Sequence, residues 1–263
     1  MKAKMLLDGG KPKVPPGALR TILERAGMTV GERGADFGVV VGGDGRFSMY
    51  GRTEEMPLLF VGVRARGAGG SMAHLAQANF DELPEALDRV VKGAYTVDEH
   101  KRLAVLKNER KVGEVFTDVY LQRGSQSDCI RYRVRVSGKG VDFQEAAIGD
   151  GVVISTRAGA SGYYSYPDRI RGEWMEPGAF ASLKKDEVGI CHINPTFTER
   201  SGESHHPLRY RIPWGSKVEL SLFREADARL YGTTDTKTGI GVALGDTLTV
   251  VPGKKVTRVI SFA

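Results

Sequence analysis

Asp44 is the residue whose setting most clearly predicts chemistry. It lies in the run Gly42-Gly43-Asp44-Gly45, directly after the apolar segment Phe37–Val41, which is typical of a strand buried on both faces. Glycines let backbone N–H groups approach a bound anion because no Cβ stands in the way. A carboxylate at the carboxyl end of such a strand, where α/β sheets bind ligands, can accept a hydroxyl proton. A tight turn without chemistry is the alternative.

A second glycine–aspartate run lies later in the chain. Gly149-Asp150-Gly151 is followed by three apolar residues, by Ser155-Thr156 and by the loop 157–163. Together the two runs resemble the NAD kinase family, in which one strand ends in Gly-Gly-Asp-Gly and a later Gly-Asp-Gly segment leads into Ser-Thr-Pro-Thr-Gly-Ser-Thr-Ala-Tyr. The segments 57–63, 82–87 and 244–250 also agree with the family, so the resemblance extends over most of the chain.

The resemblance implies a kinase that transfers a phosphoryl group from ATP or polyphosphate to the 2′-hydroxyl of NAD. That reaction needs a base near the hydroxyl, a cation that screens the phosphates, and a groove that holds both substrates in line. By resemblance, Asp44 is the catalytic base and a contact for Mg²⁺ or another divalent cation. The resemblance also implies that the neighbours of Asp44 lie next to the nucleotide: Gly42, Gly43, Gly45 and Arg46.

Further nucleotide-binding residues are implied in the second half of the chain. Thr117 and Asp118 stand where the family has an Asn-Glu pair that holds the NAD ribose and base. Asp118 still offers two acceptors for a ribose diol, whereas Thr117 lacks the donor and acceptor of an amide. The remaining positions belong to the second glycine–aspartate run and its loop: Asp150, Arg157, Ser161, Gly162, Tyr163 and Tyr164.

The loop also departs from the family pattern. Arg157 replaces a proline, Ala158 a threonine and Ala160 a serine, so two hydroxyl groups are missing and one cation has been gained. We expect Arg157 to contact a phosphate or carboxylate of the ligand. The changes leave open a non-catalytic nucleotide-binding relative. A diacylglycerol-type lipid kinase is a further alternative. Such a kinase would associate with a membrane, but we see no basic amphipathic helix or apolar anchor in the sequence that would bind one.

No other catalytic or metal-binding pattern is present. No Gly-Lys-[Ser/Thr] ends a glycine loop, and the residues around Ser161 lack the spacing of a nucleophile elbow. Cys191, His192, His205 and His206 match no zinc-ligand spacing, so we expect core or surface roles for them and predict no metal site among them.

Asp44 must be positioned by the strands and helices around it. The sequence pattern predicts that these form an α/β domain with a small parallel sheet over residues 1–93. Strands are expected at residues 2–7, 37–41 and 58–63, and helices at 17–26 and 81–92. Asp81 is the expected cap of the second helix, and Gly93 its end. The basic loop 64–70, with two arginines and three glycines, is either solvated or in contact with phosphate.

Residues 94–263 predict a β-rich, sandwich-like domain that binds NAD. Short alternating strands are expected at 130–136, 151–155, 209–212, 217–223 and 248–250. The family resemblance implies that the final segment, 256–262, returns to the first domain.

The whole chain has 263 residues, a formal net charge of +6 and a sequence pI near 9.3. That balance suits anionic ligands, but no nucleic-acid-binding signature accompanies it, so nucleic acid is not an expected partner. No apolar run reaches the roughly 20 residues of a membrane span, and no signal-peptide pattern opens the sequence. We therefore expect a cytoplasmic protein without membrane contact, and the resemblance implies a homo-oligomer.

Overall fold

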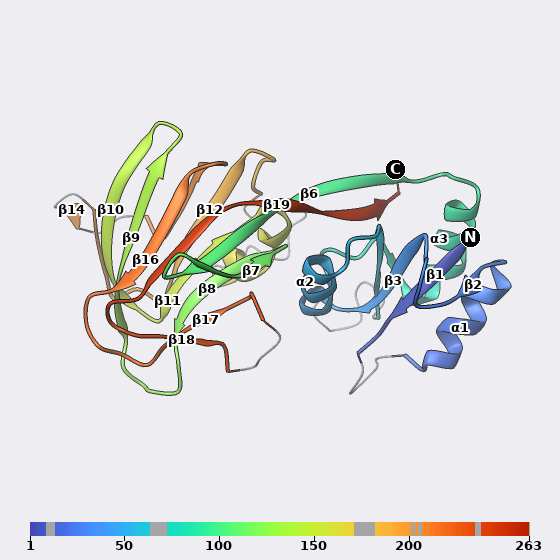
Figure 1. The fold of residues 1–263 in the computed structure, drawn as a ribbon, viewed down its shortest axis with the longest axis horizontal. Coiled ribbons are helices and arrows are strands. Elements are labelled where there is room, and N and C mark those ends of the chain that lie inside the picture. The colour runs from blue at the N-terminus through green and yellow to red at the C-terminus, as the bar shows by residue number, and fades with distance from the viewer. Residues whose placement is uncertain are drawn as a thin grey trace. The chain divides into compact units, whose positions relative to one another are not determined.

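The computed structural model describes residues 1–8, 14–63, 73–170, 182–200, 203–204, 207–234 and 238–262. The chain divides into two compact units, Met1–His100 with Val256–Ala263, and Lys101–Lys255 (Figure 1). Two long strands, β6 (Thr96–Lys107) and β19 (Thr247–Ser261), contribute residues to both units. The first unit extends to His100 rather than to the expected Gly93, because the first part of β6 belongs to it.

The first unit is built on a parallel sheet with the strand order β2-β1-β3-β4. Its strands are β1 (Lys2–Leu6), β2 (Thr29–Val30), β3 (Phe37–Gly42), β4 (Leu58–Gly62) and β5 (Ala78–Asn79). Val39 lies opposite Met5 on one side and opposite Leu59 on the other. Both β5 and the end of β19 pair with β4 in parallel. Every residue of β3 is buried, as its unbroken apolar run predicts.

Helices cover both faces of this sheet (Figure 1). The helices α1 (Pro16–Arg25) and α3 (Leu83–Val91) pack one face through an apolar cluster that includes Leu19, Leu23 and Leu87. The helix α2 (Asp44–Thr53) covers the other face, where the rings of Phe47 and Phe60 stack with centroids 4.6 Å apart. The predicted α/β fold class of this unit is confirmed.

Two local predictions in this unit need correction. The run around Asp44 is not a simple turn, because Gly43 is the N-cap of α2 and Asp44 is its first residue. Asp81 does not cap the later helix. A 3₁₀ turn, Phe80–Glu82, precedes α3, and Asn79 caps that turn while its own N–H donates to the Glu82 carboxylate at 2.8 Å. Gly93, with φ +70°, follows the end of α3.

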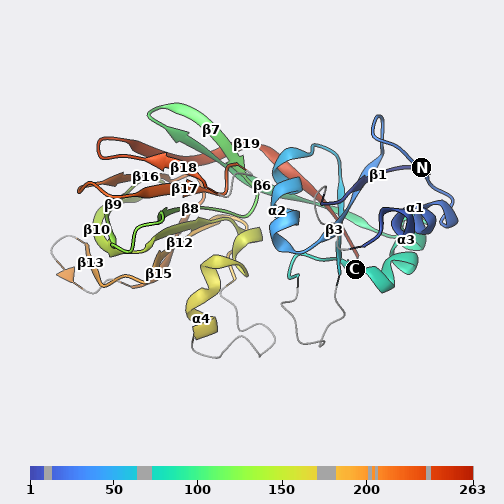
Figure 2. The same cartoon turned by 90° about the horizontal axis from the view of Figure 1, so that it is seen from below.

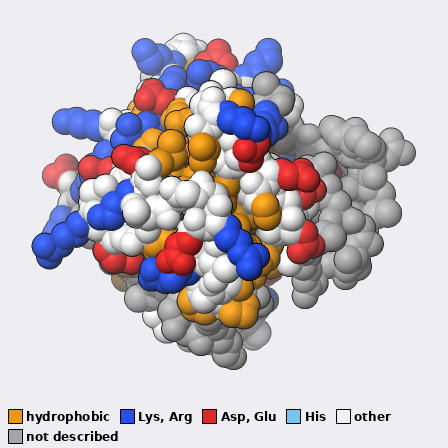
Figure 3. All heavy atoms as spheres, turned by 90° about the vertical axis from the view of Figure 1, so that its right-hand side faces the viewer, with side chains coloured by type: hydrophobic (Ala, Val, Ile, Leu, Met, Phe, Trp, Pro, Cys, Tyr) orange, Lys and Arg blue, Asp and Glu red, His pale blue; other side chains and the backbone are white. Residues whose placement is uncertain are grey.

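Apolar side chains form a band between charged groups on the face of the first unit that carries α1 and α3 (Figure 3). Met1 and Val91 are among the large apolar residues exposed in this unit, at 50% and 51%. The excess positive charge of the chain is therefore not gathered on this face as a basic surface. Among the described residues, no helix is long and apolar enough to cross a membrane.

The second unit is a β-sandwich of two largely antiparallel sheets, which confirms the predicted β-rich fold (Figure 2). Sheet I has the order β14-β13-β10-β9-β16-β19, with β6 and β7 joined beyond β19. Sheet II has the order β15-β12-β11-β8-β17-β18. The new strands of sheet I are β7 (Arg110–Val115), β9 (Ile130–Gly138), β10 (Val141–Gly149), β13 (Phe197–Arg200), β14 (Glu203–Ser204) and β16 (Lys217–Leu222). Those of sheet II are β8 (Asp118–Arg123), β11 (Gly151–Ser155), β12 (Glu187–Ile193), β15 (Arg209–Pro213), β17 (Ala228–Tyr231) and β18 (Ile240–Val242).

Two inner strands of sheet II, β11 and β12, are buried on both faces. The inner face of this sheet meets sheet I in a core that includes Val134, Leu220, Leu121 and Ile190. The chain that follows β11 forms two 3₁₀ turns and the short helix α4 (Tyr166–Ile170), which lies on the outer side of sheet II (Figure 2). The segment that begins with the second glycine–aspartate run therefore supplies the strand β11 of this sheet and then packs against its outer face.

A buried charged cluster joins the two sheets. Oε1 of Glu145, on β10, lies 3.0 Å from Nε2 of His192, on β12, and accepts a short hydrogen bond from the hydroxyl of Tyr210, on β15. Oε2 accepts hydrogen bonds of 3.2 and 2.9 Å from Arg200, on β13. Burial alone would raise the pKa of Glu145, but the hydrogen bonds and charge of these partners hold it below its ordinary value.

We predict that Glu145→Ala lowers the free energy of unfolding by about 3–5 kcal/mol, because it leaves buried donors and the partly buried guanidinium of Arg200 without their acceptor. Urea denaturation of purified protein measures the change. Glu219→Ala is the matched control in the same sheet, since its ion pair with Lys217 is solvent-exposed and is worth at most about 1 kcal/mol. An equal decrease in the free energy of unfolding for the two variants would show that the buried cluster contributes no more to stability than an exposed ion pair does.

Candidate functional site

Asp44 lies where the sequence placed it, at the carboxyl end of β3, and its carboxylate is held by backbone groups. Oδ2 accepts a hydrogen bond of 3.0 Å from the N–H of His74, and Oδ1 one of 3.0 Å from the N–H of Leu75. The side chain thus fastens the segment that enters β5. Each oxygen keeps a second lone pair, so the carboxylate can still accept a proton or contact a cation.

Among the described residues, little fills the space beside Asp44. A Cβ placed on Gly43 or Gly45 would meet none of their atoms within 4 Å, whereas one on Gly42 would lie 3.0 Å from Cβ of Arg46. None of these three glycines has a positive φ. Their contribution is therefore the room that they leave next to the first turn of α2, where helix geometry favours anions.

Arg46 is engaged by the protein itself. Its guanidinium forms a short ion pair with Asp8 and lies 3.3 Å from the sulfur of Met49. On the next turn of α2, the hydroxyl of Tyr50 donates to the carbonyl of Leu7 at 2.7 Å. The two contacts join α2 to the chain after β1, so the charge of Arg46 is already compensated. The predicted basic loop 64–70 lies outside the described residues.

Asp118 is the first residue of β8, and its carboxylate has few partners. It accepts hydrogen bonds from the hydroxyl of Thr117, at 3.2 Å, and from the backbone N–H of Tyr163. Burial raises the pKa of Asp118 to about 6, and these two hydrogen bonds offset only part of that effect. No cation pairs with it among the described residues. The structure thus brings Thr117, Asp118 and Tyr163 together.

Asp150, in contrast, is compensated on both oxygens. Arg123 Nε lies 2.8 Å from Oδ1, and Asn194 Nδ2 donates to Oδ2 at 3.0 Å. The next residue, Gly151, has φ +146°, and a Cβ there would collide with the carbonyl of Leu121. Asp150 and its glycine neighbour therefore have a structural role at the start of β11, in addition to the predicted role in binding.

The loop after β11 presents some of the predicted residues and buries others. Ser161, Gly162 and Tyr163 are half-buried, and Arg157 is exposed and has no partner among the described residues. Tyr164 is only 1% exposed, because its ring packs in the cluster on the outer face of sheet II and its hydroxyl donates to the carbonyl of Tyr210 at 3.3 Å. Its position in the core is a correction to its predicted place at the ligand.

An ion pair that the sequence did not predict holds this loop in place. Arg209, on β15, donates from both terminal nitrogens to the two carboxylate oxygens of Asp168, on α4, at 2.8 and 2.7 Å. Asp168 is 3% exposed. The same guanidinium donates to the carbonyl of Tyr164 at 3.3 Å and lies 5.2 Å from its ring centroid. These contacts join the segment from Tyr164 to Asp168 to β15.

A row of four tyrosines also went unrecognised in the sequence. The rings of Tyr166, Tyr163, Tyr120 and Tyr231 follow one another with centroid separations of 6.1, 5.4 and 5.3 Å. All four are half-buried. The sequence feature that could have indicated this row is the alternation along β8. Asp118 and Tyr120 share one face of the strand, while Val119 and Leu121 face the core.

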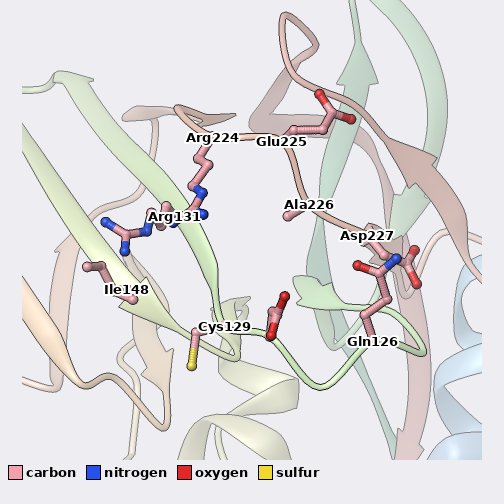
Figure 4. Close-up of a pocket in the computed structure, with 9 residues that line it drawn as sticks. Gln126, Cys129, Arg131, Ile148, Arg224, Glu225, Ala226 and Asp227 are labelled. Carbon is pink, nitrogen blue, oxygen red and sulfur yellow. The ribbon is translucent and has the colours of Figure 1, made fainter.

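A pocket of about 320 Å³ lies elsewhere in the second unit, between the loops that flank β9 and β17 (Figure 4). Its lining includes Cys129, Arg131 and Arg224 and none of the predicted site residues. Cys129 and Cys191 are both free thiols, and burial raises the pKa of Cys191 to about 12. Within the described ranges, no group of three or more histidines, cysteines or acids is placed to hold a metal ion.

Comparison with known proteins places these features in a family context. The chain is 32% identical over 234 residues to an NAD kinase from Geotalea daltonii, which covers 86% of this chain and 73% of that relative. It is 26% identical over 239 residues to an NAD kinase from Magnetococcus marinus, covering 88% and 70%. No family model matches the chain.

Two solved structures share the fold. A yeast NADH kinase complexed with NADH matches with a TM-score of 0.71 and 12% identity, covering 100% of this chain and 83% of that one. An NAD kinase from Archaeoglobus fulgidus in complex with ATP matches with a TM-score of 0.68 and 16% identity, covering 100% and 94%. At these identities the likeness shows the fold and not the site.

The raised pKa of Asp118 predicts a pH-dependent cost to stability. A folded-state pKa of about 6 against 3.8 means that the folded state holds this proton more tightly, so wild-type stability falls as the pH rises through 6. Asp118→Asn should therefore be about 1–3 kcal/mol more stable than wild type at pH 7.5 and nearly equal to it at pH 4.

Urea denaturation at the two pH values measures this difference. Asp128→Asn, at an exposed acid of the same unit, is the control and should change stability little at either pH. A wild-type protein as stable as Asp118→Asn at pH 7.5 would contradict the raised pKa.

Proposed function

This chain belongs to the NAD kinase family, and from that premise we infer that it transfers a phosphoryl group from ATP or polyphosphate to the 2′-hydroxyl of NAD, making NADP. The identity of 32% to the Geotalea daltonii NAD kinase, over 86% of this chain, is the observation that carries the inference. The fold shared with NADH and NAD kinase structures is consistent with it.

We propose that Asp44 accepts the proton of the NAD 2′-hydroxyl. Its oxygens keep lone pairs beyond the two backbone hydrogen bonds, and no described residue fills the space that Gly43 and Gly45 leave on either side. An acceptor in this place takes the proton as the hydroxyl oxygen bonds to phosphorus and the donor's bridging oxygen leaves.

Asp118 is our choice for the residue that holds the ribose. Its carboxylate is half-buried and has no cation partner among the described residues. A ribose diol would donate to it, and hydrogen bonds to a charged acceptor are stronger than neutral ones. Asp150 is less suited to this part because Arg123 and Asn194 already occupy its oxygens.

A divalent cation fits this site in the manner usual for Mg²⁺. That ion is commonly held by one or two carboxylates together with substrate phosphates and water, so a full set of protein ligands is not needed. Asp44 would supply the protein carboxylate. When bound, the ion neutralises phosphate charge. We further propose a cytoplasmic location and a homo-oligomer, both from the family resemblance.

The proposed roles predict the behaviour of Asp44→Asn. Turnover of NAD to NADP with ATP and Mg²⁺ should fall at least about 100-fold, because an amide cannot accept the hydroxyl proton. The amide has one acceptor oxygen where the carboxylate offers two to His74 and Leu75, so stability should also fall by about 1 kcal/mol. A coupled NADP assay and urea denaturation measure the two effects.

The wild-type protein sets the reference for this assay. Normal turnover by Asp44→Asn would remove Asp44 from the chemistry while leaving the kinase intact. Wild-type protein that binds NAD but forms no NADP with ATP or with polyphosphate would instead show a non-catalytic relative, with Thr117, Ala158 and Ala160 as the first positions to restore toward the family residues.

Arg157 provides a second test of nucleotide binding. It is exposed and unpaired among the described residues, so a phosphate is an available partner. Arg157→Glu should weaken nucleotide binding about 10-fold at low salt and less at high salt, because ions screen exposed charges. Arg133→Glu makes the same change at an exposed arginine of sheet I and is the control. Equal binding by both variants at low ionic strength would remove Arg157 from the site.

A further inference from the structure

We propose that Tyr120 and Tyr231 form an aromatic platform that contacts the planar base of the bound dinucleotide and thereby sets the affinity for NAD. This role rests on the NAD kinase function proposed above. The contact would involve two residues that the family resemblance does not point to, on two neighbouring strands of sheet II.

The two tyrosines are a cross-strand pair. Tyr120 on β8 lies opposite Tyr231 on β17 in the antiparallel register. Their rings stack with centroids 5.3 Å apart and an angle of 19° between the planes. Tyr163, from the loop after β11, meets Tyr120 edge-on at 78°. The backbone of two strands and a neighbouring ring therefore fix the orientation of the pair, which is the preorganisation that a stacking surface needs.

The platform lies next to the residue assigned to the ribose. Asp118 and Tyr120 are two positions apart on β8, so both side chains project from the same face of sheet II, about 7 Å apart along the strand. A base is joined directly to its ribose. If Asp118 accepts hydrogen bonds from a ribose diol, the base attached to that ribose comes within reach of the rings of Tyr120 and Tyr231.

The hydroxyl groups distinguish this pair from the other two tyrosines of the row. Tyr166 donates to the carbonyl of His192 at 2.7 Å, and Tyr163 accepts from Gln122 at 3.4 Å. Within the described part of the chain, the hydroxyls of Tyr120 and Tyr231 have no hydrogen-bond partner, although both residues are half-buried. Both hydroxyls remain available to the polar edge of a heterocyclic base.

Calorimetric titration of the 263-residue protein with NAD tests the platform without requiring turnover. Tyr120→Ala and Tyr231→Ala should each weaken NAD binding about 5- to 100-fold, the range found when one base loses an aromatic partner. Tyr120→Phe and Tyr231→Phe keep the rings and should bind within about 5-fold of wild type. Phe197→Ala removes an aromatic ring 37% exposed on sheet I and should leave binding unchanged.

Two nucleotide fragments identify which base is involved. Titration with AMP reports an adenine contact, and titration with nicotinamide mononucleotide reports a nicotinamide contact. The fragment whose binding the alanine variants weaken names the base, and either result supports the platform. The phenylalanine variants and melting temperatures separate a loss of ring contact from a loss of fold.

The platform is overturned if folded Tyr120→Ala and Tyr231→Ala bind NAD and both fragments as wild type does. It is also overturned if the phenylalanine variants lose as much affinity as the alanine variants, because the hydroxyls and not the rings would then account for the effect. Wild-type protein that does not bind NAD at all would overturn the proposed function, and the platform with it. The two failures are thus distinguishable.

Discussion

The ion pair between Arg209 and Asp168 is the contact on which the order of the loop after β11 depends. Sheet II needs a cover on its outer face, and the chain after β11 supplies it by folding back over that sheet as two turns and α4. The turns of this segment and its five-residue helix α4 are too short to be stable by themselves. Two parallel hydrogen bonds to a buried carboxylate fasten its end to β15, and Tyr164 is packed beneath the same guanidinium. Tyr163 is held at the surface as a consequence.

Much of the first unit could be predicted because its information is local. The apolar run of β3 and the spacing of Leu19 and Leu23 in α1 are visible in the sequence and agree with the structure. The helix α2 was not predicted, and the reason is physical. Gly45 and Gly51 lower its intrinsic helix propensity, and its main apolar contact is the stacking of Phe47 on Phe60 of another element. Tertiary packing of this kind leaves no periodic pattern to read.

For the candidate site in the second unit, the sequence suggested residue types, but it could not show the electrostatic environment of each residue. Family resemblance pointed to Asp118 and Asp150 alike, and neither sequence context separates them. Their difference arises from residues on other strands, because Arg123 and Asn194 reach Asp150 while only a hydroxyl and a backbone N–H reach Asp118. The tyrosine row has the same origin, since Tyr231 meets Tyr120 only through the pairing of β17 with β8.

The contrast between the two carboxylates has a consequence for binding. Asp150 has already exchanged its water for a guanidinium and an amide, so it has little to gain from a ligand. Asp118 has lost water without full replacement, which is why its pKa lies near 6. A ribose diol would supply the missing donors, stabilise the charged form and lower that pKa again. By linkage, NAD would then bind more tightly to the ionised protein and release a proton from Asp118 when it binds near pH 6. If Asp118 holds the ribose as proposed, the cost of an under-solvated carboxylate in the free protein would thus become part of the affinity for NAD.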